Sequence, residues 1–426
     1  MKQTFKNAAL GEEYDVYTHE SGLKIYTLRK SGYSSCYAIF GTAYGSVDTC
    51  FSVGGDPITV PEGIAHFLEH KLFESEELDA FELFSKTGAD ANAYTSFDRT
   101  CYLFNCTANW KKNLEILLGF VSSPYFTAQT VQKEQGIIGQ EIQMYEDDPD
   151  WRVLFNLLCA LYHNNPVKIE IAGTRQSIAK ITDKLLYDCY NAFYNPQNMF
   201  LCIVGDIDGD EVFDVVCKNL KPRPAVDLKR HAKAEPNTIV KPYTEQALSV
   251  AKPLFMIGFK DKSDTDYQTL KRSIAVELLL DTLFSIASPL YIRLNEKGLL
   301  SQPFDCEYFD TRNTAVSLIG GESDDPKAVF EEVKKEVERV KAEGIDRELF
   351  DAAKRGRYGV RLQGFDRVEN ICGALCECAV RGTGLFESAE ILKSITAEEA
   401  EKALDAFCAD KCALSVIVPQ KGDAKQ

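Results

Sequence analysis

The pattern of apolar and polar positions along the chain predicts strands and helices in a recurring order. Strands are predicted at 35–48 and 92–107, where β-branched and aromatic residues dominate. A helix is predicted at 61–74, with Pro61 near its start. A second helix is predicted at 128–148, a polar run of residues with high helix propensity. This order of elements is typical of an α+β domain.

The second half of the chain repeats this order, with a predicted strand at 253–259 followed by a predicted helix at 270–295. The segment 180–205 also aligns without a gap with the segment 394–419. The aligned pairs include Ile181 with Ile395, Thr182 with Thr396, and Phe193 with Phe407. Each copy has the pattern of an N-cap threonine, an amphipathic helix, a turn and an apolar strand. We therefore predict two related domains.

A polar, proline-rich stretch separates the two halves. It contains Pro222, Pro224, Pro236 and Pro242 among many charged residues, a composition typical of a linker. We predict a first domain at 1–220, a linker at 221–246 and a second domain at 247–426.

The formal net charge of −16 makes a nucleic-acid or anionic-membrane partner an unfavourable hypothesis, because either needs a surplus of Lys and Arg on one face. The first thirty residues contain no apolar run of the length that a signal peptide or a membrane span requires, so we expect a cytoplasmic protein. The 14 cysteines are scattered and form no CxxC pair, which predicts reduced and mostly buried thiols. Cys372, Cys376 and Cys378 are interpreted as small core residues of a helix and not as a metal site.

The segment HFLEH contains the clearest chemical motif. His66 and His70 are one helical turn apart and Glu69 lies between them, so a helix projects all three side chains from one side. This is the H-x-x-E-H pattern, in which two imidazoles bind zinc and the glutamate faces the open coordination position. Two histidines could also share a helix face by chance, but the chain has only five histidines.

A catalytic zinc site requires a third protein ligand, which is commonly a carboxylate. Glu134 and Glu141 are two turns apart on one face of the predicted helix, with Ile137 and Ile138 between them to pack beside the metal helix. Either glutamate could bind the ion while the other orients a histidine. Spacing alone leaves this choice open, and most helical glutamates are solvated surface residues.

HFLEH, the NAYTS strand and the E-x6-E pair together resemble the pitrilysin and insulysin peptidases, especially the branch of mitochondrial processing peptidase and its bacterial relatives. The resemblance extends over nearly the whole chain, including AGT and FYNPQNM. It implies two homologous α+β domains, each a largely antiparallel sheet covered by helices. It also implies Zn²⁺ bound by His66, His70 and Glu141, with Glu134 as a supporting acid. Asn92, Ala93 and Tyr94 would bind substrate backbone as an edge strand.

The predicted function is therefore that of a zinc-dependent metalloendopeptidase, in which Glu69 is the general base that activates the metal-bound water. Peptides or unfolded segments are the expected substrates. Two alternatives remain: a catalytically weak or inactive assembly subunit of the same fold, and a metal-storage or chaperone module.

The second half departs from the family pattern. Relatives have an arginine followed seven residues later by a tyrosine, which contact the substrate and the developing oxyanion. Here Asn295 occupies the arginine position and Gln302 lies near the tyrosine position, with Tyr308 as another possible donor. We therefore expect a dimer, and we slightly favour a heteromer with a paralogue that carries the R-x6-Y pair. The alternative is a homodimer or monomer in which Gln302 or Tyr308 acts as a weaker donor.

Overall fold

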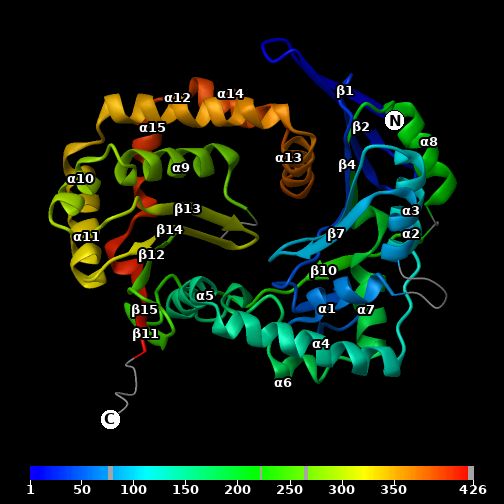
Figure 1. Ribbon diagram of the computed structural model, residues 1–426, viewed down its shortest axis with the longest axis horizontal. Helices are drawn as coiled ribbons and strands as arrows, with labels where there is room; N and C mark the ends of the chain where they lie inside the picture. The colour runs from blue at the N-terminus through cyan, green and yellow to red at the C-terminus, as the bar shows by residue number, and fades with distance from the viewer. Residues whose placement is uncertain (75–79, 221–222, 263–266, 421–426) are drawn as a thin grey trace. The chain divides into compact units, whose positions relative to one another are not determined.

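The computed structural model describes residues 1–74, 80–220, 223–262 and 267–420 of the chain (Figure 1). These residues form two compact units. Unit 1 comprises 1–142, 170–232 and 361–386, and unit 2 comprises 143–169, 233–360 and 387–426. Residues 75–79, 221–222, 263–266 and 421–426 lie outside the described residues.

Unit 1 is built on a seven-stranded sheet with the order β1-β2-β3-β9-β4-β8-β7. All neighbouring strands are antiparallel except β3 and β9, which are parallel. The strands are β1 (Lys2–Asn7), β2 (Glu12–Thr18), β3 (Lys24–Arg29), β4 (Cys36–Thr42), β7 (Asp90–Thr95), β8 (Thr100–Cys106) and β9 (Met199–Gly205). A separate small sheet contains β5 (Cys50–Val53), β6 (Ile58–Thr59) and β10 (Leu228–Arg230).

Helices cover both faces of the large sheet of unit 1 (Figure 1). Consecutive strand residues point to opposite faces, and β8 shows which helices cover each one. Cys101 contacts Cys376 of α13 (Val368–Arg381), whereas Tyr102 packs its ring against Phe120 of α3 (Trp110–Val121). The other helices of unit 1 are α1 (Ile64–Leu72), α2 (Ala80–Thr87), α6 (Arg175–Ile178), α7 (Asp183–Phe193) and α8 (Gly209–Asn219). The helix α4 (Ala128–Asp147) begins in unit 1 and ends in unit 2.

The five-stranded sheet of unit 2 has the order β11-β15-β12-β14-β13. Its strands are β11 (Tyr243–Leu248), β12 (Leu254–Lys260), β13 (Asp305–Thr311), β14 (Thr314–Glu322) and β15 (Cys412–Pro419). The pair β11–β15 is parallel and the other pairs are antiparallel, which is the arrangement of β3-β9-β4-β8-β7 in unit 1. The register also agrees. Phe200 and Leu414 are aligned in the sequence repeat, and each faces the first residue of the parallel neighbouring strand, Lys24 of β3 and Tyr243 of β11 respectively. The predicted α+β fold class and the internal repeat are therefore confirmed.

The helical part of the repeat is present as well. Thr182 and Thr396 are both N-caps, and their hydroxyl oxygens accept hydrogen bonds from the backbone N–H groups of Leu185 and Glu399. The second copy is shorter, because α15 (Ala397–Glu401) continues as a 3-10 turn where α7 continues as an α-helix.

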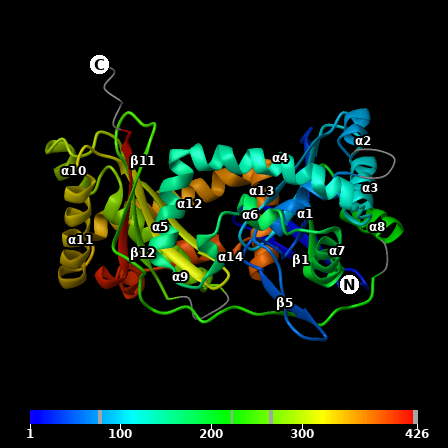
Figure 2. The ribbon, with the colours of Figure 1, turned by 90° about the horizontal axis from the view of Figure 1, so that it is seen from below.

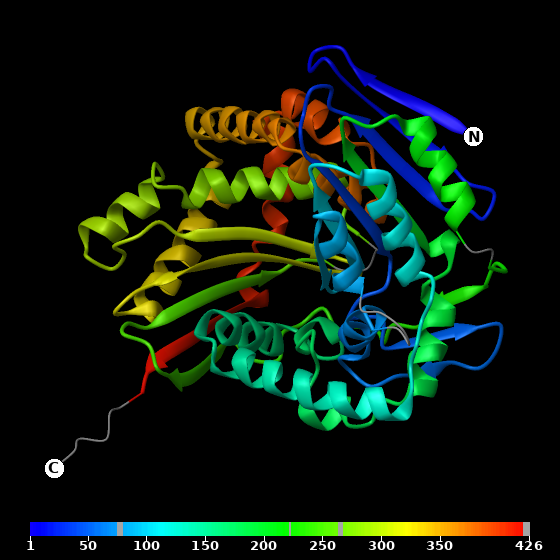
Figure 3. The same ribbon diagram turned by 45° about the vertical axis from the view of Figure 1, so that its right-hand side comes forward.

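The sheet of unit 2 lies between α9 (Leu270–Phe284) and α5 (Pro149–Leu161), as Figure 3 shows. Gly258 of β12 faces α5, and a Cβ atom there would lie 2.8 Å from a methyl carbon of Leu161. The glycine therefore lets α5 approach the sheet closely. On the other face, Ile257 and Phe259 join one apolar core with residues of α9 and of α11 (Pro326–Glu343).

The prediction of one helix over 270–295 is wrong in one respect. The chain forms two helices, α9 and α10 (Pro289–Glu296), because Ser288 caps the second helix and Pro289 occupies its first position. By length and composition alone, the stretch Leu270–Glu296 would be apolar enough to cross a membrane. However, 67% of its most apolar window is buried, as expected for a core helix of unit 2.

The compact units differ from the predicted division at 1–220, 221–246 and 247–426, because each half of the sequence contributes one helix to the other sheet. The helix α5 belongs to unit 2, where it contacts β15 and β12, and α13 belongs to unit 1, where it contacts the equivalent strands β9 and β4. Part of the predicted linker also forms β10, which pairs with β5. The remaining helices are α12 (Arg347–Gln363) and α14 (Glu387–Ser394).

The cysteines are free thiols, as predicted, and most are buried. Cys372, Cys376 and Cys378 are core residues of α13. Cys159 is an exception because it is exposed on α5, although its sequence context is apolar. An amphipathic helix can place a single thiol outside the buried stripe even within an apolar run.

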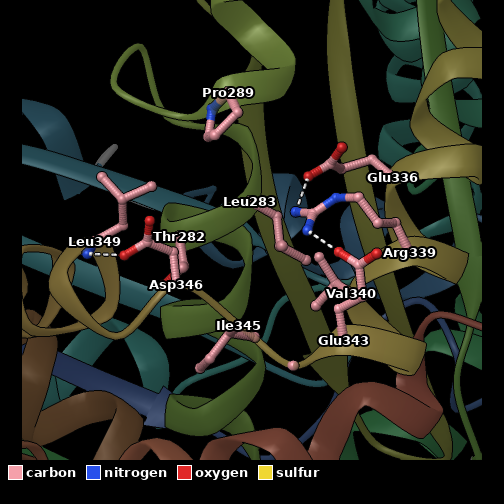
Figure 4. Close-up of a pocket in the computed structure, with 11 residues that line it drawn as sticks. Thr282, Leu283, Pro289, Glu336, Arg339, Val340, Glu343, Ile345, Asp346 and Leu349 are labelled. Atoms are coloured by element: carbon pink, nitrogen blue, oxygen red, sulfur yellow. Dashed lines mark hydrogen bonds and ion pairs between the residues drawn. The ribbon is translucent and has the colours of Figure 1, made fainter.

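A hollow of about 380 Å³ opens in unit 2 beside α9, α11 and the start of α12 (Figure 4). Its charged side chains are bound to neighbouring groups. Arg339 forms ion pairs with Glu336 and Glu343 at 2.6 and 2.8 Å, and the carboxylate of Asp346 accepts a hydrogen bond from the backbone N–H of Leu349. Glu336 also pairs with Arg293 outside the hollow, so these charged side chains already have partners within unit 2.

Candidate metal centre

The helix that carries HFLEH is fixed at its N-terminal end by a close contact between two backbone segments. Gly63 precedes α1 with a φ of +89°, and a Cβ atom there would lie 2.4 Å from the carbonyl oxygen of Ala172. Gly173 has a φ of +76°, and its Cβ would lie 2.5 Å from the carbonyl oxygen of Glu62. Glycine is therefore required on both sides. The AGT segment, residues 172–174, therefore contacts the chain just before α1 and positions the start of the helix that carries HFLEH.

The helix α1 brings the two histidines together. The rings of His66 and His70 are 4.6 Å apart between centroids, and both Nε2 atoms face the carboxylate of Glu141 on α4. The distances are 3.5 Å from His66 Nε2 to Glu141 Oε1 and 3.6 Å from His70 Nε2 to Glu141 Oε2. One ligand atom from each of the three residues lies within 4.8 Å of the other two. Figure 2 shows the ribbon segments α1 and α4 that carry them.

Glu134 also reaches the site, but it contacts the far side of a histidine ring. Its Oε1 lies 3.0 Å from His70 Nδ1, so the carboxylate fixes the ring orientation and leaves Nε2 directed at Glu141. Burial lowers the pKa of the His70 imidazole. The hydrogen bond with Glu134 and the negative charges of Glu69, Glu134 and Glu141 outweigh this effect and raise the pKa above its ordinary value. The carboxylates around the imidazoles therefore create a site that favours a cation.

These residues fit a zinc ion. Two imidazole nitrogens and one carboxylate oxygen are the donor set of a catalytic zinc site. Tetrahedral ligands at about 2.0–2.1 Å from zinc are about 3.4 Å from one another. The observed separations of 3.5 and 3.6 Å are close to this spacing. His66, His70 and Glu141 therefore have both the chemistry and the spacing of a metal centre, and Glu134 occupies the place of an orienting group.

Glu69 lies beside this centre, and its partner was not predicted from the sequence. Its Oε2 accepts a hydrogen bond of 2.8 Å from the hydroxyl of Thr95, the last residue of β7. Glu69 is only 8% exposed. Burial raises the pKa of the Tyr102 phenol, and the electrostatic effects of Tyr194 and Glu69 raise it further. Thr95 belongs to the NAYTS segment, but nothing in a single sequence indicates which side chain of that segment faces α1.

The predicted packing of α4 needs one correction. Ile138 is fully buried, as expected, but Ile137 is 46% exposed. Helical geometry explains the difference, because Ile138 lies on the side of α4 that continues through the buried Val131 and Ile142, whereas Ile137 lies beyond the edge of that side.

The residues predicted to bind substrate lie in β7. This strand forms one edge of the large sheet, and no other strand of the described residues pairs with its outer side. The backbone N–H of Ala93 donates to Oδ1 of Asn92 at 2.8 Å, and Tyr94 is 39% exposed. The strand therefore has an open edge. The role of Asn92, Ala93 and Tyr94 in substrate binding stays a prediction.

In unit 2, Asn295 and Tyr308 have structural partners, whereas Gln302 is exposed. Asn295 donates a hydrogen bond from its side chain to the carbonyl oxygen of Leu300 at 3.0 Å. Tyr308 is buried, and its hydroxyl donates to the carboxylate of Asp261 at 2.7 Å. The phenol of Tyr308 is therefore engaged inside unit 2, which disfavours it as a replacement for the family tyrosine.

Comparisons with known proteins agree with this architecture. A family model described as Insulinase (Peptidase family M16) matches residues 60–175, and a model described as Peptidase M16 inactive domain matches residues 180–357. The second description suits the repeat, because α9, the first helix of the second half, contains no histidine.

Individual relatives resemble nearly the whole chain. A Bacillus subtilis protein named as the uncharacterized zinc protease YmfH is 39% identical over 408 residues, which cover 94% of this chain and 95% of the relative. The crystal structure of a protein named as a putative M16-like peptidase from Alicyclobacillus acidocaldarius has a TM-score of 0.93 and 32% identity over 98% of this chain and all of that one. A protease from Helicobacter pylori shares the fold, with a TM-score of 0.82 and 19% identity, over 96% of this chain and all of that one. The chain belongs to the M16 peptidase family.

Proposed function

We propose that the chain is a zinc-dependent metalloendopeptidase. The observation that carries the proposal is the convergence of His66, His70 and Glu141 on one point, with Glu69 on the same helix as the two histidines. The names of the relatives support it, since several are called zinc proteases. A protein that only stores metal would have no use for an extra carboxylate held beside three ligands.

Each residue then has a separate task. When bound, zinc would lower the pKa of a water molecule and polarise the scissile carbonyl. His66, His70 and Glu141 hold the ion, and Glu134 keeps the His70 ring in place through Nδ1. The carboxylate of Glu69 takes the proton from the attacking water and passes it to the leaving amine. Both proton transfers require Glu69 to remain beside the metal ligands and not to become one of them.

The open edge of β7 supports a substrate in extended conformation. A peptide that adds to β7 would form backbone hydrogen bonds that do not depend on its sequence. One adjustment is needed, because the Asn92 side chain accepts the hydrogen bond of the Ala93 N–H. An incoming carbonyl would displace it, and the freed Asn92 amide would bind the substrate in turn. Flexible peptides can adopt this conformation more easily than folded proteins, so they are the proposed substrates.

We further propose that a paralogue with the R-x6-Y pair completes the enzyme as a heteromer. The observation behind this is the loss of both residues here, together with the engagement of Tyr308 by Asp261. A single oxyanion donor is worth about 3–4 kcal/mol in other enzymes, so adding the paralogue should raise the cleavage rate by at least about a hundredfold. Equal rates with and without the paralogue, or no effect of a Tyr→Phe change in it, would contradict the heteromer.

Cleavage of fluorogenic peptides by the purified chain tests the proposed activity. The zinc-loaded protein should cleave within the peptide and not only at its ends, chelation should stop cleavage, and zinc should restore it. A chain that binds zinc stoichiometrically but cleaves no peptide, alone or with the paralogue, would favour the inactive-subunit alternative.

A further inference from the structure

We propose that Thr95 is a positioning residue that connects the substrate-binding strand β7 to the general base Glu69. This inference rests on the proposed function, because it assigns a task to a contact made by the base. It predicts that turnover depends on the Thr95 hydroxyl, whereas zinc binding does not.

The first support is the contact itself. Thr95 Oγ1 lies 2.8 Å from Glu69 Oε2, and Glu69 is largely buried. A buried carboxylate is costly unless hydrogen-bond donors stabilise its charge. A hydroxyl that donates to a carboxylate forms one of the stronger hydrogen bonds in proteins, and it holds one oxygen in a fixed direction. The second oxygen of Glu69 then has a defined position for accepting a proton.

The second support is that the Thr95 hydroxyl does not donate its proton to the neighbouring hydroxyl of Thr100. Thr100 lies opposite Thr95 in the β7–β8 pair, and its hydroxyl donates to the carbonyl oxygen of Tyr44 at 2.8 Å. The two threonine hydroxyls are 3.4 Å apart, which is long for an O–H···O bond. Each hydroxyl has one proton. Thr100 therefore donates to Tyr44 and Thr95 donates to Glu69.

The third support is the rigidity of both partners. Immediately after Thr95, the backbone N–H of Ser96 donates to the carbonyl oxygen of Arg99 at 2.8 Å and closes the turn between β7 and β8. Glu69 lies on α1, whose start is fixed by the contact between Gly63 and Gly173. A catalytic group is held most accurately when its supporting residue lies on a rigid element. A peptide that pairs with β7 would further restrain the strand that holds the base.

Two substitutions at position 95 test this role. Thr95→Val keeps the shape and removes the donor, whereas Thr95→Ser keeps the donor. Losing a hydrogen bond to a charged group should lower kcat about tenfold or more in Thr95→Val. KM should change less than about threefold, since the backbone of β7 still pairs with substrate. Thr95→Ser should restore most of the turnover, and both variants should bind zinc like the wild type.

Thr4→Val is the matched control. Thr4 donates to the carboxylate of Asp15 at 2.6 Å, in β1 at the opposite edge of the same sheet. This variant loses the same type of bond and should cleave at the wild-type rate. If Thr95→Val fails to fold, Thr95→Ala takes its place in the comparison, because it removes the same hydrogen-bond donor with less apolar bulk.

Crystal structures of the metal-free wild type and Thr95→Val provide a second readout. In the variant, the Glu69 carboxylate should leave the position next to residue 95. The inference is wrong if Thr95→Val keeps wild-type kcat, if Thr95→Ser does not restore a lost kcat, or if Glu69 keeps its position. A wild-type chain that cleaves no peptide would contradict the proposed function instead, and the two crystal structures would still decide whether Thr95 positions Glu69.

Discussion

Replacing Glu134 by Gln tests whether this residue supports the metal through His70. Glu134 is 5% exposed, and its contact with His70 Nδ1 at 3.0 Å is the only hydrogen bond described for its side chain. Gln has nearly the same volume, and its side-chain oxygen can still accept from Nδ1. The substitution therefore removes the charge while retaining most of the packing and the hydrogen bond.

The expected loss follows from this difference. A charge-assisted hydrogen bond is roughly twice as strong as a neutral one, and changes in groups that orient metal ligands cost about 10- to 100-fold in affinity. The loss of zinc affinity in Glu134→Gln should lie near the lower limit of this range, about tenfold or 1.4 kcal/mol. Glu134→Ala also leaves Nδ1 without this acceptor and should lie near the upper limit, about a hundredfold.

Competition with a chromophoric chelator measures these zinc affinities. Glu146→Gln is a suitable control, because Glu146 is an exposed glutamate of the same helix and should leave the affinity unchanged. Glu141→Gln should lose more affinity than either Glu134 variant, since a ligand is replaced. If Glu134→Gln binds zinc as tightly as the wild type, the orienting role is wrong. If it loses as much as Glu141→Gln, Glu134 is itself a ligand.

Four further predictions concern the same site and the backbone contact that positions it. His70→Ala should lose bound zinc, because two ligands hold the ion poorly, and stoichiometric zinc in the purified variant would contradict the assignment. Zinc affinity measured against pH should begin to fall while the pH is still above 6.5, the ordinary imidazole value, because the pKa of His70 is raised and below it the proton competes with the metal. The stability of the metal-free protein should depend on pH in the opposite direction. Protonated His70 stabilises the fold below its unfolded-state pKa, and this contribution to the free energy of unfolding is lost as the pH rises through the folded-state pKa. Gly173→Ala should lower the free energy of unfolding by about 1–3 kcal/mol in urea denaturation, because φ is positive there and the new Cβ meets the Glu62 carbonyl; a smaller effect than at the open, positive-φ Gly382 would contradict the role of this contact.

The sequence was most informative where chemistry depends on local spacing. The separation of His66 and His70 requires only a helix, and the structure provides one over Ile64–Leu72. The alignment of Thr182 with Thr396 likewise predicted two N-caps that the structure shows. In both cases the relevant interactions lie within one element.

Features that depend on long-range packing could not be predicted in this way. The assignment of α5 and α13 to the sheets of opposite halves depends on which apolar faces meet, and hydrophobic periodicity does not specify the partner of a face. The contact between Thr95 and Glu69 joins residues of two elements, and β-strand alternation indicates a shared face but not a specific neighbour. The break before Pro289 was missed because the apolar pattern continues across it.

The most direct test of the whole account is a comparison of Glu69→Gln with the wild type, with zinc content and peptide cleavage measured on the same samples. Glu69 is interpreted as a base and not as a ligand, so the variant should retain near-stoichiometric zinc while kcat falls at least about a hundredfold. Peptide binding should persist. A variant that loses its zinc, or one that cleaves at the wild-type rate, would contradict the mechanism.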